Sequence, residues 1–84
     1  PKPIIALTDL VVFKKQVLGV GKNHMKLVVK GDGIDLLTLT LFNCEEDIAK
    51  ISENSVIDVV GYPDINVWNG RESVEFNVRE WKFH

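Results

Sequence analysis

The chain has 84 residues, of which 45% are hydrophobic and 26% are charged, and its formal net charge is −2 at pH 7. These values are typical of one small globular domain and exclude a disordered or fibrous chain. No apolar run approaches the roughly 20 residues that a membrane helix needs, and no segment has the pattern of a signal peptide, so we expect a soluble domain with no membrane partner.

The first part of the chain predicts a lead-in and a strand. The chain begins at Pro1 without an initiator methionine, which favours a fragment of a longer protein. We expect residues 1–9 to be a linker and residues 10–84 to form the domain. Residues 10–18 are apolar and β-branched around two lysines, and they stop at a Gly-Val-Gly run that permits a sharp loop. This pattern predicts the first strand.

The next segment predicts an antiparallel pair of strands. Apolar and polar residues alternate over 25–30, which is the two-residue period of a strand with one buried and one solvent-facing side. A Gly-Asp-Gly run at 31–33 supplies the positive-φ residues of a hairpin. Residues 34–42 form the third predicted strand, with alternate leucines on its buried side. Phe42, at its end, is expected in the core, and a stacking role is its alternative.

A short helix should follow. Asn43 can serve as its N-cap, and Glu46 lies three residues later, in the position of a capping box. We expect about two turns of helix, with Ile48, Ala49 and Ile51 as its apolar stripe and with Asn54 and Ser55 closing it. The consecutive acids at 45–47 point apart on a helix, so they complement the helix dipole and do not converge on a metal ion. Cys44, the only cysteine, is expected to be a small, half-buried residue; it cannot form an internal disulfide and favours a reducing cytoplasm.

The remaining chain predicts a long hairpin. Residues 56–62 form the fourth predicted strand, which bends at its glycine, and residues 73–79 form the fifth, with Val74 on the buried side. Between them lies a Trp-Asn-Gly-Arg run at 68–71, in which Asn-Gly favours a tight turn that presents an aromatic ring and a cation together. Trp81 lies beyond the regular alternation and is expected to be a packing residue.

The predicted order is three strands, one helix and two further strands. This order favours an all-β domain with one short helix, the five-stranded Greek-key barrel called the OB-fold. A ferredoxin-like sandwich would need a second helix, which the sequence does not supply. An SH3-like barrel lacks a helix between its third and fourth strands, so the OB-fold is the architecture that fits.

Charge is segregated along the chain despite the small net value. Residues 1–30 carry six lysines and one acid, residues 31–70 carry one lysine and eight acids, and residues 71–84 carry three of each sign. We therefore expect one basic and one acidic face, and the basic face coincides with the surface that OB-folds use for oligonucleotides. The candidate nucleic-acid-binding residues lie on this face and in its two flanking loops: Lys22, Asn23, His24, Lys26, Lys30, Thr38, Thr40, Trp68, Asn69 and Arg71.

Each candidate also has a purely structural interpretation. The lysines of the second strand can be its solvent-facing side, and His24 can simply begin that strand. Trp68 can cover the end of the barrel instead of stacking on a base. Arg71 can pair on the surface with Glu72 or Asp64, which is worth under ~1 kcal/mol.

Several runs, in order, carry a family resemblance. They are His24-Met25-Lys26-Leu27, the Gly31-Asp32-Gly33 turn, Ile57-Asp58-Val59-Val60 and, most specifically, Ile65-Asn66-Val67-Trp68-Asn69-Gly70-Arg71-Glu72-Ser73. With these runs, residues 24–80 resemble the OB-fold domain near the C-terminus of bacterial RecJ-type single-strand-specific exonucleases. The opening Pro-Lys-Pro resembles the linker that leads into that domain.

The resemblance implies a role within a larger enzyme. Such exonucleases hydrolyse phosphodiester bonds at a two-metal site of aspartates and histidines, which implies Mn or Mg in the parent's catalytic core. This chain has only His24 and His84 and no Asp-His-His run, so we expect no catalytic residue, metal ligand or cofactor in it. The resemblance implies instead a module that binds single-stranded DNA, has the catalytic core of the same polypeptide as its partner, takes no small-molecule substrate and acts in DNA repair and recombination.

Two other functions stay open. The acidic central block would repel phosphates, which favours a structural or protein-docking OB domain. An RNA-binding OB module of the transfer-RNA type is the other alternative. A titration with single-stranded DNA and with RNA separates these functions.

Overall fold

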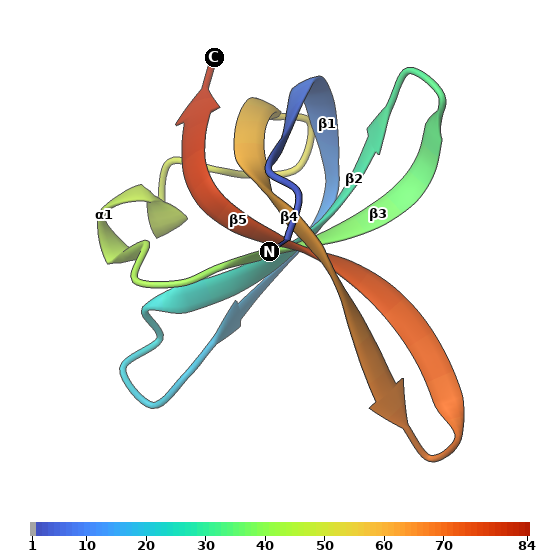
Figure 1. The fold of residues 1–84 in the computed structure, drawn as a ribbon. Coiled ribbons are helices and arrows are strands. Elements are labelled where there is room, and N and C mark those ends of the chain that lie inside the picture. Colours follow the sequence, from blue (N-terminus) through green and yellow to red (C-terminus); the bar gives the residue numbers. More distant parts are fainter. Residues whose placement is uncertain (1) are drawn as a thin grey trace.

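The protein forms a closed barrel of five strands. The structure is a computed structural model that describes residues 2–84. For Trp68 it describes the backbone alone. The strands are β1 (Ile5–Leu18), β2 (His24–Gly31), β3 (Ile34–Leu41), β4 (Val56–Trp68) and β5 (Arg71–Phe83), and helix α1 (Glu45–Ile48) connects β3 to β4 (Figure 1). Around the barrel the order is β1-β2-β3-β5-β4, with β3 and β5 parallel and the other neighbours antiparallel. This arrangement confirms the predicted OB-fold.

Strand β1 begins earlier than the sequence predicts. It starts at Ile5, so residues 5–9 of the expected linker belong to the barrel. The first part of β1 pairs with β4 and the second part with β2. The register with β4 shifts between Leu7 and Leu10, where Asp9 has a φ of 56°. This irregularity lets one bent strand pair with two neighbours and close the barrel.

The core lies inside the barrel and is closed at one end by residues that flank α1. Its buried side chains are Leu10, Val12, Met25, Leu27, Val29, Leu39, Leu41, Cys44, Ile51, Ile57, Val59, Phe76 and Val78. Two residues predicted to be buried are not. Phe42 is 49% exposed because it follows the end of β3, and Val74 is 55% exposed because it precedes the part of β5 that joins the barrel.

Helix α1 is a single turn, shorter than predicted. Its N-cap is Cys44, which makes no side-chain cap, and Asn43 has a φ of 53° instead, so the predicted capping box is wrong. At the other end, Lys15 Nζ donates to the carbonyl oxygens of Ile48 and Ile51, the latter at 2.7 Å. Within the described part of the chain, no helix is long and apolar enough to cross a membrane.

Two residues hold α1 against the barrel. Trp81 is partly buried against the core, as predicted, and its Nε1 donates to the Asp47 carboxylate at 2.7 Å. Cys44 is fully buried, more than the half-buried position expected, and this burial raises the pKa of its thiol. A buried, neutral thiol behaves as a small apolar group, so Cys44 contributes packing.

Strands β4 and β5 continue beyond the barrel as a paired hairpin. Among the described residues, 65–74 pair only with one another, and we call them the arm. A two-residue turn at Asn69 (φ 50°) and Gly70 (φ 74°) closes its tip, as Asn-Gly predicts. The arm projects from the barrel on the same side as the β1–β2 hairpin (Figure 1). Near its base the register shifts at Gly61, where a Cβ would overlap the carbonyl oxygen of Asn77, so the predicted bend is a bulge that needs glycine.

Candidate nucleic-acid interface

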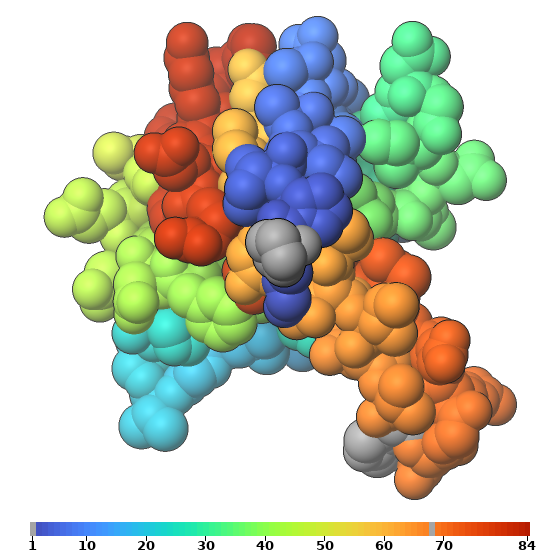
Figure 2. Space-filling view, in the orientation of Figure 1, coloured from blue at the N-terminus to red at the C-terminus, as the bar shows by residue number. Residues whose placement is uncertain are grey.

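A groove lies between the β1–β2 hairpin and the arm, where Figure 2 shows a hollow. Its larger part is a cavity of about 280 Å³ lined by Leu18, His24, Lys26, Thr40, Phe42, Asp64, Glu75 and Asn77. A second cavity of about 250 Å³ is lined by Lys14, Gln16, Lys26, Val28, Thr38 and Glu75. Because Lys26 and Glu75 line both cavities, the two form one continuous surface, which we call the groove.

Strand pairing places these side chains on the outside of the barrel. The residues on either side of Lys26 are fully buried, so Lys26 faces out, opposite Thr40 of β3. Val28 and Thr38 form the next outward pair. Parallel pairing then brings β5 alongside β3, with Glu75 opposite Thr38. The predicted face of β2 and β3 is therefore widened by a third strand.

Glu75 connects the side chains at the centre of the groove. Its carboxylate lies 3.0 Å from the Lys26 ammonium and accepts a hydrogen bond from the Thr40 hydroxyl at 3.2 Å. Burial acts to raise the pKa of Glu75, but the hydrogen bond and charge of Lys26, with hydrogen bonds from Thr40 and Asn66, outweigh it, so the pKa lies below its ordinary value. The carboxylate is therefore ionised at neutral pH and neutralises Lys26. The basic face predicted from the charge pattern has an acid at its centre.

Two rings form a wall of the larger cavity. His24 and Phe42 make an edge-to-face pair with ring centroids 5.3 Å apart. The backbone N–H of Asn43 donates to His24 Nδ1 at 3.0 Å, which fixes the position of the imidazole. The half-exposed ring of Phe42 is a flat apolar surface of the kind on which unpaired bases stack.

The other candidates from β2 and its loop lie outside the two cavities. Lys30 Nζ is 4.7 Å from the ring centroid of Phe13, in a cation–π contact. Lys22 is exposed in the β1–β2 loop, with a φ of 52°. Asn23 accepts the backbone N–H of Cys44 on its carbonyl oxygen at 2.9 Å, which ties this loop to the start of α1. The backbone of Asn23 therefore has a structural role, the binding role of its side chain stays a prediction, and the lysines flank the groove.

The arm carries the last three candidates. Alternate side chains share one face of β5, so Arg71 lies on the groove side of the arm, and Asn69 is exposed in its turn. The side chain of Trp68 lies outside the described part of the structure, so its stacking role stays a prediction. Within the described residues Arg71 makes no ion pair with the acids considered above, and Asp64 lies 3.5 Å from Lys2 Nζ instead.

Sequence reasoning missed several residues that line the groove. Glu75 and Asn77 reach it through the parallel pairing of β3 with β5, and Asp64 reaches it from the base of the arm. Pairing between strands so distant in the chain leaves no local pattern in the sequence. Phe42 was expected in the core, with stacking as the alternative, and its position just past the end of β3 is the signal that favours an outward ring.

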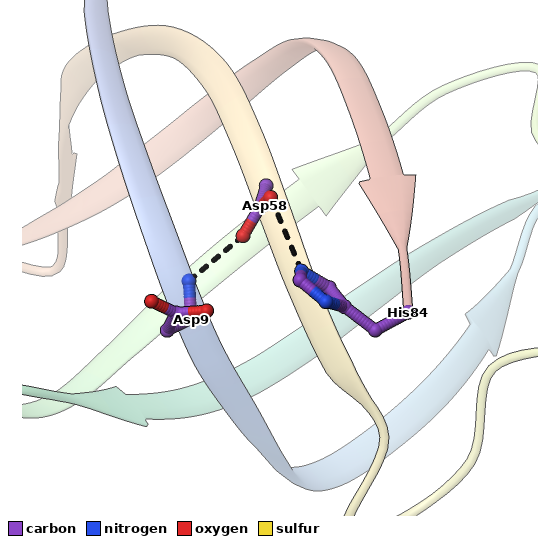
Figure 3. A group of neighbouring side chains, drawn as sticks. All are labelled: Asp9, Asp58 and His84. Atoms are coloured by element: carbon purple, nitrogen blue, oxygen red, sulfur yellow. Dashed lines mark hydrogen bonds and ion pairs between the residues drawn. The ribbon is translucent and has the colours of Figure 1, made fainter.

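A separate cluster joins β1, β4 and the residue after β5 (Figure 3). Asp58 accepts a hydrogen bond from the backbone N–H of Asp9 at 2.8 Å and lies 3.1 Å from His84 Nε2. These two contacts hold the pKa of Asp58 below its ordinary value. The three side chains offer ligand atoms within 4.8 Å of one another. Because one Asp58 oxygen fixes the backbone of β1 and the other contacts His84, we assign the cluster a structural role.

Similar proteins exist both by sequence and by fold. The chain matches the family model described as the RecJ OB domain over residues 1–80. It is 28% identical over 80 residues to the single-stranded-DNA-specific exonuclease RecJ of Bacillus subtilis (strain 168). The matched stretch covers 95% of this chain but only 10% of that protein. The chain thus spans about a tenth of the length of this curated relative.

The fold is similar to that of the small single-stranded DNA-binding protein from Streptomyces coelicolor. The TM-score to its crystal structure is 0.61, at 10% sequence identity, over 100% of this chain and 95% of that one. At this level of identity the likeness concerns the fold alone, and it supports the OB architecture.

Proposed function

This chain belongs to the RecJ OB domain family, and we propose that it is the single-stranded-DNA-binding module of a RecJ-type, single-strand-specific exonuclease. In this proposal the module holds the strand, and a catalytic core elsewhere in the same polypeptide hydrolyses it with bound Mn or Mg. The parent enzyme would act in DNA repair and recombination, in the cytoplasm. The observation that carries the proposal is the groove, because it lies on the surface with which OB-folds bind oligonucleotides.

The groove has the two features that single-strand binding requires, flat rings for the bases and cations for the phosphates. Phe42 and His24 offer the rings. Lys14 lines the second cavity, and Lys30 flanks it. A duplex keeps its bases paired and stacked on each other, so it cannot place them on these rings. The groove is therefore expected to prefer unpaired polynucleotide.

The isolated chain should bind weakly. Stacking of one base contributes roughly 1–3 kcal/mol, and phosphate contacts add a term that falls with salt. Because Glu75 neutralises Lys26, we expect micromolar or weaker affinity at physiological salt and tighter binding at low salt. In the parent enzyme the same contacts act at a high effective concentration, since the catalytic core and this domain hold one strand together.

Replacing Phe42 with alanine tests the proposal. In a titration with fluorescent oligodeoxythymidine at low salt, Phe42→Ala should weaken binding roughly five- to 150-fold, as the loss of one stacked base predicts. Ile65→Ala is the matched control, because Ile65 is equally an exposed apolar residue but lies on the arm face away from the groove. Equal affinity of Phe42→Ala and the unmodified chain, or equally tight binding of a duplex, would contradict the proposal.

A second function, protein docking, is favoured by the face of the arm that points away from the groove. Ile65, Val67 and Val74 are exposed there by 62%, 65% and 55%, and Ile65 pairs directly with Val74. Contiguous exposed apolar side chains are typical of contact surfaces. In a nuclear magnetic resonance titration with oligodeoxythymidine, shifts in the groove support DNA binding and their absence favours docking. The same titration with RNA tests the RNA-binding alternative.

A further inference from the structure

The larger cavity of the groove has more acidic than basic side chains in its lining, although it lies on the lysine-rich face. Two carboxylates, Glu75 and Asp64, line it together with Lys26. Lys26 is held 3.0 Å from Glu75, and Asp64 lies 3.5 Å from the exposed ammonium of Lys2. The charges at the cavity therefore do not favour a phosphate inside it.

A nucleobase suits this cavity better than a phosphate. Its volume of about 280 Å³ lies just below the range of ligand pockets, roughly 300–1,000 Å³, which suits a ligand as small as one base. Leu18, Phe42 and His24 give it an apolar and aromatic wall, while Thr40 and Glu75 give it polar groups. A planar base can stack on the wall and present its polar edge to these groups, with its phosphates left outside near the flanking lysines.

We propose that this cavity reads one base of the bound strand and that Glu75 gives it a preference for cytosine over thymine. The inference rests on the proposed function and adds base selectivity to it. The carboxylate of Glu75 accepts a hydrogen bond from the exocyclic N4 amine of cytosine. Thymine carries the carbonyl oxygen O4 at the same position, and that oxygen is repelled by a carboxylate.

Glu75 has acceptor capacity left for this bond. An ionised carboxylate offers about four acceptor sites. Three side chains occupy part of them: Lys26, which contacts both oxygens at 3.0 and 3.1 Å, Thr40 and, with the smallest effect, Asn66. The side chain is still 18% exposed, and it lines the cavity. Because its existing bonds hold the carboxylate in place, the acceptor is preorganised, which lowers the entropic cost of binding the base.

The affinities of the 84-residue chain for oligodeoxycytidine and oligodeoxythymidine of equal length test this inference. Both strands are pyrimidine homopolymers with the same backbone, so the ratio of their affinities isolates the base edge. A hydrogen bond to a charged acceptor predicts roughly five- to 50-fold tighter binding of oligodeoxycytidine at neutral pH.

Substitution of Glu75 by glutamine should bring this ratio close to one. The amide of Glu75→Gln can accept from cytosine or donate to thymine, so it no longer discriminates between them. The same change should tighten binding of oligodeoxythymidine, because Lys26 is no longer neutralised. Glu72→Gln is the matched control, since it removes the same charge from an exposed position of the arm that does not line either cavity. It should leave the ratio unchanged.

The possible outcomes separate this inference from the proposed function. Equal affinities of the unmodified chain for the two strands, or a ratio that survives Glu75→Gln, overturn the base preference and leave single-strand binding intact. A lack of binding to either strand overturns the proposed function and, with it, this inference.

Discussion

At the scale of single residues, two neighbouring lysines of β1 serve different parts of the molecule. Lys14 lines the groove, whereas Lys15 donates to the carbonyl oxygens of Ile48 and Ile51 at the end of α1. The last carbonyls of a helix lack intrahelical partners, and a cation near them is favourable. Because side chains alternate along a strand, the first lysine is available to a phosphate and the second stabilises the fold.

Methionine substitutions separate these two roles. Lys15→Met should lower the free energy of unfolding by about 1–2 kcal/mol, because the helix carbonyls lose a charged donor, and should leave the salt dependence of DNA affinity unchanged. Lys14→Met should change stability by less than ~0.5 kcal/mol but flatten the log-log salt slope by about 0.7. Urea unfolding and titrations at several salt concentrations measure both quantities. An equal loss of salt slope in the two variants would contradict this assignment.

Asp58 gives the fold a pH dependence. The N–H of Asp9 and the contact with His84 hold the folded pKa of Asp58 below the value of about 3.9 expected in the unfolded chain. The folded state therefore binds this proton less readily than the unfolded state. The stability that Asp58 contributes is complete above the unfolded pKa and is lost as the pH falls through the lower, folded pKa.

Melting curves of Asp58→Asn test this dependence. The variant should have a lower Tm than the unmodified chain at neutral pH, and the difference should shrink as the pH falls below about 4. Circular dichroism melts over a series of pH values measure the difference directly. A Tm difference that stays constant down to acid pH would show that the ionised Asp58 carboxylate does not stabilise the fold.

At the scale of elements, the bulge at Gly61 lets β4 and β5 belong to both the barrel and the arm. Gly61→Ala should lower the free energy of unfolding by roughly 2–3 kcal/mol, because its Cβ would overlap the backbone of Asn77. Gly70→Ala is the control, since nothing lies within 4 Å of a Cβ there and only its φ of 74° opposes alanine, at a cost of about 1 kcal/mol. Thermal unfolding distinguishes the two variants, because each kcal/mol of lost stability lowers the Tm by about 4–8 °C. The account fails if Gly61→Ala melts no lower than Gly70→Ala.

The elements that local chemistry determines could be predicted from the sequence. The Asn-Gly turn at the arm tip and the bend at Gly61 need particular residues, so the sequence marks them. Prediction failed where a distant partner decides the structure. Strand β1 extends back to Ile5 because β4 pairs with it, although Thr8 and Asp9 interrupt the apolar pattern. Helix α1 ends after one turn without the predicted side-chain cap.

The candidate site could be predicted in part for the same reason. The outward residues of β2 and β3 follow from a two-residue period, and several of them line the groove. The residue at the centre of the groove, Glu75, contacts Thr40 across 35 positions of sequence, and only the closure of the barrel brings them together. The charge pattern therefore predicted a basic face but not the carboxylate inside it.

At the scale of the whole molecule, the net charge of −2 is less informative than the arrangement of the charges. The first turn of α1 carries three consecutive acids, whereas Lys14, Lys26 and Lys30 lie on or beside the groove. The strength of salt dependence should therefore report the few cations of the groove and not the total charge.

The slope of log affinity against log salt concentration measures how many of these cations contact phosphates. For single strands, each phosphate contact lowers log affinity by about 0.7 per log unit of salt concentration. Three contacts, from Lys14, Lys22 and Lys30, therefore predict a slope of about −2. Glu75→Gln releases Lys26 as a fourth contact and should steepen the slope to about −3. Glu72→Gln should not change it. An identical slope in Glu75→Gln and the unmodified chain would mean that Lys26 does not face the phosphates.

The most direct test of single-strand binding in the groove is a map of amide chemical-shift changes on the 84-residue chain during titration with a single-stranded oligonucleotide. The account predicts that the changes concentrate on the groove-lining parts of β2, β3 and β5, including Lys26, Thr40 and Glu75, and that a duplex of the same sequence produces much smaller changes. Changes confined to α1 or to the apolar face of the arm, or equal changes with the duplex, would contradict it.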